Sequence, residues 1–207
     1  MCIRDRYEIE PADLKSIAAT FASVFPHATM WLVGDGDLLL IGSTDREIER
    51  QVAHLPERLR AGSTPQLLEY MGIPPASAPF VVASLFAGGG AAIADYAAGA
   101  VLQTDDRTSL EFSAARAMYE RLPTANAEEI RSLAAKHPPP AAIAHWTRQA
   151  SAADWTERGG AALRAEAFEM ARASFVRAIN LDPHSSKALR GLSETCLLYT
   201  SPSPRDS

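Results

Sequence analysis

Few residues in this sequence have the types and the spacing that chemistry requires. The candidates are an alternating glycine–aspartate run, a triple glycine, two adjacent carboxylates and five histidines: Gly34–Asp37, Gly88–Gly90, Asp105 with Asp106, and His27, His54, His137, His145 and His184. Gly34–Asp37 lacks the further acidic positions of a calcium loop, so the apolar runs around it favour a hairpin turn. Arg107 follows the two carboxylates, which favours a helix cap or an ion pair over catalysis at Asp105 and Asp106.

The glycines and the histidines give equally weak signals. No clear strand precedes Gly88–Gly90 and no lysine follows at the spacing of a phosphate-binding loop, so we predict a helix break there. No two histidines stand at metal-ligand spacing, and no Ser-His-Asp arrangement can be argued from their order. The sequence therefore predicts no catalytic residue, no cofactor-binding residue and no metal site.

The two terminal segments of the chain differ in character from the sequence between them. The first six residues, MCIRDR, and the last twelve, CLLYTSPSPRDS, resemble translated sequencing adapter. Residues 1–6 and 196–207 are therefore expected to carry no information about the fold, and the natural sequence is expected to be a fragment. Both cysteines, Cys2 and Cys196, lie in these ends, so no disulfide or thiolate site is expected in the natural part.

Charge and hydropathy exclude some classes of function. The formal net charge is -5 and no basic run is present, which argues against a nucleic-acid surface. The stretch from Pro79 to Leu102 is long enough to span a membrane. It contains Asp95 and three consecutive glycines, so two short buried helices are predicted instead.

The natural part begins with a predicted helix and hairpin. Pro11 suits a first helical turn, apolar residues then recur at helical spacing, and Pro26 ends the helix. ATMWLV and LLLIGS, on either side of Gly34–Asp37, predict the two strands of a hairpin. Both runs are apolar almost throughout, so both faces are expected to be covered. A hairpin cannot bury that surface alone, and the rest of its sheet is expected upstream.

Short helices are predicted through the middle of the chain. Residues 45–60 contain Pro56 and predict broken helix, and the next helix is expected to have Thr64 as its cap and Gly72 at its end. Residues 109–112, SLEF, predict a short extended piece. Residues 126–137 predict an amphipathic helix with Asn126 and Glu129 as a capping box, followed by a stiff linker, HPPPAA.

The last region has the spacing of a tetratricopeptide repeat, a helical hairpin of roughly 34 residues. The matching positions are Trp155, Gly159, Ala171, Phe175, Ala178 and Pro183. Arg158 and Ala162 depart from the pattern, which usually has leucine and tyrosine there. One repeat further on, Leu189 and Leu192 fall at apolar positions, so a second repeat is expected to begin. A protein partner is the ligand class that such repeats imply.

The first part resembles a known family. YEIEPADLKSIAATFASVFPHATMWLVGDGDLLLIGS is similar to the last helix and terminal hairpin of the spermidine synthase (polyamine aminopropyltransferase) family, closest to bacterial members fused to a multi-span membrane region. LQTDDRTSLEF, at residues 102–112, resembles a segment that follows the synthase domain in those fused proteins. Some of them also carry tetratricopeptide repeats. The resemblance covers roughly residues 7–119.

This resemblance implies a methyltransferase-like Rossmann fold, with a mainly parallel sheet whose last strand enters antiparallel through a hairpin. It implies aminopropyl transfer from decarboxylated S-adenosylmethionine, as co-substrate, to a polyamine. The family's glycine-rich loop and catalytic aspartates would precede Tyr7, so this chain alone is expected to be inactive. Trp31 is the one candidate substrate-binding residue, as an aromatic wall for the amine; plain core packing is the alternative.

The sequence thus predicts an α/β remnant followed by an all-α helical hairpin. The expected divisions are adapter at 1–6, the synthase-like part with a helical extension at 7–121, a helix and proline-rich linker at 122–151, the repeat region at 152–195, and adapter at 196–207. The first functional hypothesis is a piece of a spermidine synthase-like aminopropyltransferase, a cytoplasmic portion of a parent anchored in the bacterial inner membrane. The alternative is a non-catalytic tetratricopeptide interaction module on a Rossmann-like scaffold.

Overall fold

The computed structural model describes residues 9–44, 52–104 and 125–200. The chain divides into two compact units, each described by itself. The sheet unit comprises Met1–Leu32, Gly36–Ile48 and Phe86–Pro139, and the helical unit comprises Val33–Asp35, Glu49–Leu85 and Pro140–Ser207.

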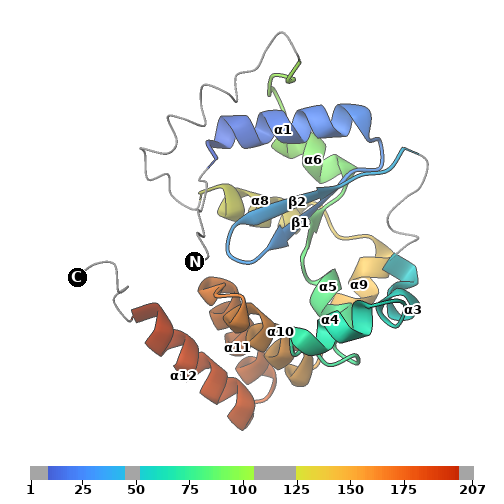
Figure 1. The fold of residues 1–207 in the computed structure, drawn as a ribbon. Coiled ribbons are helices and arrows are strands. Elements are labelled where there is room, and N and C mark those ends of the chain that lie inside the picture. Colours follow the sequence, from blue (N-terminus) through green and yellow to red (C-terminus); the bar gives the residue numbers. More distant parts are fainter. Residues whose placement is uncertain (1–8, 45–51, 105–124, 201–207) are drawn as a thin grey trace. The chain divides into compact units, whose positions relative to one another are not determined.

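Among the described residues, the sheet unit contains a small antiparallel sheet and three helices (Figure 1). Its strands are β1 (Thr29–Val33), β2 (Asp37–Ile41) and β3 (Phe86–Gly88), in the order β2-β1-β3. Its helices are α1 (Pro11–Val24), α6 (Gly90–Tyr96) and α8 (Ala125–Lys136). The core consists of apolar side chains from α1, β1, β3, α6 and α8, among them Ala18, Met30, Ile93, Tyr96 and Ile130.

The predicted hairpin is present, with a turn at residues 34–36 in which Gly34 has a positive φ of 63°. Glycine adopts that conformation without the steric cost that a side chain would bring. β1 is buried along most of its length, as predicted. β2 alternates between exposed and half-buried positions, with Leu39 49% and Ile41 39% exposed. The expectation that both faces are covered is therefore right for β1 and wrong for β2.

The third strand comes from downstream, whereas the sheet was expected to continue upstream. β1 pairs antiparallel with β3 through Met30 opposite Gly88 and Trp31 opposite Phe86. β3 lies inside the stretch for which only helices were predicted, between α5 (Ala78–Ala83) and α6. A three-residue strand is too short to show an alternating pattern, which explains the miss. The two short helices predicted there are both present, and the described strands include no parallel pair.

The α8 helix is present, but the capping box predicted for it is wrong. Asn126 is already the second helical residue, and its amide donates a 2.8 Å hydrogen bond to the carbonyl of Ile9. Glu129 accepts a 2.7 Å bond from Lys15 Nζ on α1. Both side chains therefore bind α8 to the start of the sheet unit and do not cap their own helix.

The helical unit is built from seven described helices. They are α3 (Leu55–Leu59), α4 (Thr64–Tyr70), α5, α9 (Ala141–Arg148), α10 (Ala152–Arg164), α11 (Phe168–Leu181) and α12 (Ser186–Thr200). Gly72 ends α4 with a φ of 62°, as predicted, whereas Thr64 is the first helical residue and Ser63 takes the cap position. α9 follows the prolines of the expected linker, because Pro140 stands at its N-cap, where proline does not interrupt a helix.

Some predicted features fall outside the described residues or differ at the chain's end. Asp105, Asp106 and residues 109–112 lie outside the described ranges. α12 continues from the natural sequence through Cys196 to Thr200, because the adapter-like residues there include no glycine or proline to end it. None of the helices among the described residues is long and apolar enough to cross a membrane.

Candidate functional site

A groove between α10 and α12 is the candidate site among the described residues. α10, α11 and α12 follow one another along the chain and pack together in the helical unit (Figure 1). The α10 helix begins with a capping box, in which Ser151 Oγ accepts from Asp154 N at 3.2 Å and Ser151 N donates to Asp154 Oδ2 at 2.9 Å. This Ser-x-x-Asp signal was readable in the sequence and was missed.

One aromatic ring holds the three helices together. Phe175 of α11 is 2% exposed. A Cβ at Gly159 of α10 would lie 2.7 Å from the Phe175 ring, and a Cβ at Gly191 of α12 would lie closer still, so neither position has room for a side chain. The sequence predicted Gly159, Phe175, Ala171 and Ala178 as positions of the repeat pattern, and the two alanines are fully buried. Gly191 was missed, because the repeat pattern places no glycine there.

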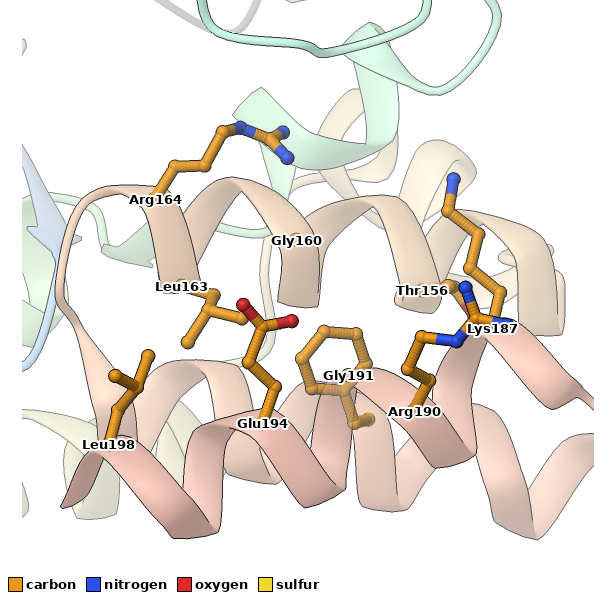
Figure 2. A pocket seen from close by; sticks show the side chains of 10 residues that line it. Thr156, Gly160, Leu163, Arg164, Lys187, Arg190, Gly191, Glu194 and Leu198 are labelled. Carbon is orange, nitrogen blue, oxygen red and sulfur yellow. The ribbon is translucent and has the colours of Figure 1, made fainter. Parts of the chain in front are cut away.

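The groove that results has a volume of about 400 Å³. It is lined by residues of α10, α11 and α12, namely Thr156, Gly160, Leu163, Arg164, Phe175, Lys187, Arg190, Gly191, Glu194 and Leu198. Figure 2 shows the α12 residues along one face of the helix, with Lys187 and Arg190 near its start, Glu194 further on and Leu198 near its end. Leu198 belongs to the adapter-like segment, whereas the other lining residues belong to the natural part of the sequence.

The charged side chains of the groove have different partners. Lys187 Nζ lies 2.5 Å from Glu157 Oε1, which connects α12 to α10 at one end of the groove. Arg164 turns away from the groove (Figure 2) and donates hydrogen bonds to the carbonyls of Met71, at 2.8 Å, and Gly72, at 3.0 Å. It therefore binds the two carbonyls that follow the last residue of α4. No described residue forms an ion pair or hydrogen bond with the Arg190 side chain.

Arg158, the departure from the repeat pattern, has a structural role. Its Nε donates to Ser84 Oγ at 2.7 Å, and its Nη1 donates to the hydroxyl of Ser174, which is fully buried in α11. Its guanidinium also lies 5.5 Å from the centre of the Trp155 ring. Trp155 in turn makes an edge contact with Phe80 of α5, at 4.9 Å between ring centres. Arg158 therefore joins α10 to both α5 and α11.

Two ionisable groups of the described part of the chain have clearly displaced pKa values. Burial raises the pKa of the Tyr96 hydroxyl, and the charge of Glu129 adds to that effect, so the phenol stays protonated and is a poor base. Burial also acts to raise the pKa of Asp154, but hydrogen bonds from Ser151 and Ser77 outweigh it. The Asp154 pKa therefore lies below its ordinary value, and the carboxylate stays charged at neutral pH.

The predicted substrate-binding residue, Trp31, lies in the sheet unit and is 6% exposed. Its Nε1 donates to Thr29 Oγ1 at 2.9 Å, and its ring meets Phe86 edge-on with 5.4 Å between ring centres. The indole thus packs against both the hairpin and β3. This placement leaves the amine-wall role of Trp31 a prediction.

The remaining chemical candidates are not brought together. His137 pairs with Asp95 at 2.6 Å, and within the described ranges no three His, Cys, Asp or Glu side chains gather as metal ligands. A strand does precede Gly88–Gly90, contrary to the sequence interpretation, since β3 ends at Gly88 and α6 begins at Gly90. The seven-residue α6 that follows has no lysine, so a phosphate-binding loop is still not formed.

Comparison with known proteins adds nothing to this geometry. No protein-family model matches the chain, and no curated protein or solved structure shows significant similarity to it.

Proposed function

We propose that residues 152–195 form a tetratricopeptide-type module that binds a peptide segment of a partner protein in the groove between α10 and α12. The observation that carries this proposal is the packing around Phe175. One ring, in contact with two glycines on different helices, holds α10 and α12 against the same helix. Two helices held in this way present a groove to an extended ligand.

The composition of the groove supports a peptide ligand over a small metabolite. The lining combines apolar surface from Leu163 and Phe175 with both signs of charge from Lys187, Arg190 and Glu194. None of the described residues near it forms a metal-ligating group. A peptide offers both apolar side chains and charged groups along its length, which such a mixed surface can bind.

The experiment is a selection from a library of random displayed peptides with the full chain and two tryptophan variants. Glu194→Trp places a large ring in the groove from an exposed position, whereas Ser193→Trp places the same ring on the neighbouring exposed position, which does not line it. Peptides should be enriched on the unmodified chain and on Ser193→Trp, and lost on Glu194→Trp. Equal enrichment on both variants, or none on any chain, would contradict the proposal.

A second proposed function concerns the whole protein. We propose that the chain is a piece of a spermidine synthase-like aminopropyltransferase, whose missing part would bind decarboxylated S-adenosylmethionine and a polyamine. The supporting observation is the α1 helix followed directly by the β1–β2 hairpin. No described strand pairs with the outer edge of β2, and Leu39 and Ile41 remain partly exposed on this strand. A further strand of a larger sheet would cover that edge.

The complete protein tests the second proposal. Its upstream sequence should encode a glycine-rich loop after a strand and acidic residues at later strand ends. It should release methylthioadenosine from decarboxylated S-adenosylmethionine and putrescine, whereas the present chain alone should release none. No release from the complete protein with any common polyamine would contradict the proposal, as would an upstream sequence without those features.

Two finer expectations depend on the second proposal. If Trp31 forms a wall for the amine, Trp31→Phe in the complete protein should raise KM for the polyamine more than it lowers kcat, because a smaller ring still packs but binds a cation less well. If the parent is a membrane-fused enzyme, it should sediment with membranes, with this portion on the cytoplasmic side. Recovery of the complete protein in the soluble fraction would contradict the anchored parent.

A further inference from the structure

We infer that the groove selects peptides in which an apolar side chain is followed or preceded by an acidic one, with the acidic group held at the Lys187–Arg190 end. This inference rests on the proposed peptide binding and specifies its ligand. It comes from three features of the lining, which are the apolar floor, the cations at one end and the single acid further along α12.

The floor of the groove offers apolar surface. Gly160 of α10 and Gly191 of α12 both line the groove, and the Phe175 ring fills the space beside Gly191. The Phe175 ring, which contacts Gly191, contributes apolar surface to the same lining. Leu163 adds aliphatic surface from α10. An apolar side chain of a ligand can therefore bury its surface there, at about 25 cal/mol per Å².

The start of α12 carries two cationic side chains of the lining. Lys187 and Arg190 are one helical turn apart on the groove face of α12 and lie together in Figure 2. A carboxylate already lies against this end, since Glu157 Oε1 lies 2.5 Å from Lys187 Nζ. Arg190 has no charged partner among the described residues, so a ligand carboxylate can pair with its guanidinium without displacing another group.

Glu194 restricts the binding of an acidic group to the Lys187–Arg190 end of the groove. It is the one acidic residue of the lining and follows Arg190 by one turn of α12. A ligand carboxylate beside Glu194 would be repelled, whereas one beside Arg190 would be attracted. The apolar part of the peptide therefore lies over the floor and toward Leu163, and its acidic part lies toward Lys187.

The test measures binding of synthetic peptides to the full chain by fluorescence anisotropy. The probes are fluorescein-labelled serine–glycine dodecapeptides that carry one leucine and, at a varied distance on either side, one aspartate, asparagine or lysine. At the best spacing, the aspartate peptide should bind about two- to fivefold more tightly than its asparagine partner, as expected for one exposed ion pair. The lysine peptide should bind least, and added salt should reduce the differences.

Two charge-reversal variants make the test specific. Arg190→Glu should abolish or invert the preference for aspartate. Arg177→Glu makes the same change of net charge on an exposed residue of α11 that does not line the groove, so it should leave the preference unchanged. Circular dichroism checks that both variants fold.

The outcomes separate this inference from the proposed function. Equal binding of the aspartate, asparagine and lysine peptides, still blocked by Glu194→Trp, would overturn the acidic preference and leave peptide binding in place. An equal loss of preference in Arg190→Glu and Arg177→Glu would reduce it to an effect of net charge and overturn the assigned site. Binding of no peptide by any chain would contradict the proposed function and the inference together.

Discussion

The helical unit and the sheet unit obtain their cores in different ways. In α10–α12, consecutive helices pack on one another, and Phe175 joins three of them through two glycines. In the sheet unit, the core combines α1, β1, β3, α6 and α8, which come from well-separated parts of the chain. A core made from neighbours in sequence needs little more than local information. A core made from distant segments depends on pairings that no local sequence pattern indicates.

The largest difference between the units should come from truncating one apolar side chain in each. Phe175→Ala removes a fully buried ring and should reduce the free energy of unfolding by about 3–5 kcal/mol. Leu39→Ala removes a side chain that is 49% exposed on β2, and it should cost no more than about 1 kcal/mol. Urea unfolding of the full chain, followed by circular dichroism and tryptophan fluorescence, measures both.

The fluorescence can be assigned to one unit by a background substitution. Trp31 lies in the sheet unit, whereas Trp146 and Trp155 lie in the helical unit. In a Trp31→Phe background the remaining signal therefore reports the helical unit. Similar losses of unfolding free energy for Phe175→Ala and Leu39→Ala would contradict the view that the helical unit has a closed core and the sheet unit a partly open one. In the complete protein the cost of Leu39→Ala should rise, if a further strand covers β2.

A second test concerns the two glycines of the groove floor. Gly191→Ala places a Cβ against the Phe175 ring and should destabilise the helical unit by about 1–3 kcal/mol. Gly160→Ala is the matched control in α10, where a Cβ meets only the end of the Arg164 side chain, at 3.3 Å. Because alanine is the better helix former, by about 1 kcal/mol, Gly160→Ala should cause no loss of stability. Equal effects in urea unfolding would show that Phe175 does not set the spacing of the helices.

Arg158 tests whether the repeat pattern or the local contacts decide stability. Arg158→Leu brings the sequence closer to the usual repeat but removes the hydrogen bonds to Ser84 and Ser174. We expect a loss of about 1–2 kcal/mol, the effect of removing charged hydrogen bonds from a partly buried site. Arg172→Leu on the exposed face of α11 removes only a pair with Glu169 and should change stability by less than about 0.5 kcal/mol. A stabilised Arg158→Leu chain would favour the repeat pattern over the contacts.

The smallest expected effects come from the cap of α10. Ser151→Ala removes the side-chain acceptor for Asp154 N and should cost about 1 kcal/mol. Because the pKa of Asp154 is lowered in the folded chain, its contribution is complete above the unfolded value of about 4 and is lost as pH falls through the lower folded value. The stability difference between the unmodified chain and Asp154→Asn should therefore shrink below about pH 4. A difference that stays constant down to strongly acidic pH would contradict this assignment.

Much of the helical unit could be predicted from residue spacing. Ala171, Phe175 and Ala178 are spaced by turns of α11, and the loops between α10, α11 and α12 are short, so the packing of these three helices follows from local pattern. The capping box at Ser151 was equally readable. Gly191 was not, because its role depends on the Phe175 ring of another helix. α9 was not predicted, because the prolines before it were interpreted as a linker, although proline also occurs at the start of helices.

In the sheet unit, residue spacing does not indicate which distant segments pair with one another. The hairpin was predicted from its glycine turn and apolar runs, but its partner β3 has three residues inside a stretch rich in helix-forming alanine. Asn126 and Glu129 have the spacing of a capping box, yet they bond to Ile9 and Lys15, more than a hundred residues earlier in the chain. Local spacing indicates what side chains can do, and the fold decides which partner they find. For the candidate site, the sequence predicted a protein-binding helical repeat but not the groove residues of α12.

The most direct test of peptide binding in the groove is an NMR titration of the ¹⁵N-labelled full chain with a peptide recovered from the displayed library. We expect the amide signals of Gly160 and Gly191 to shift with added peptide, because both glycines line the groove, while those of Gly88, Gly89 and Gly90 in the sheet unit stay in place. Shifts confined to the sheet-unit glycines, or no shift at saturating peptide, would contradict the claim that the groove between α10 and α12 is the binding site.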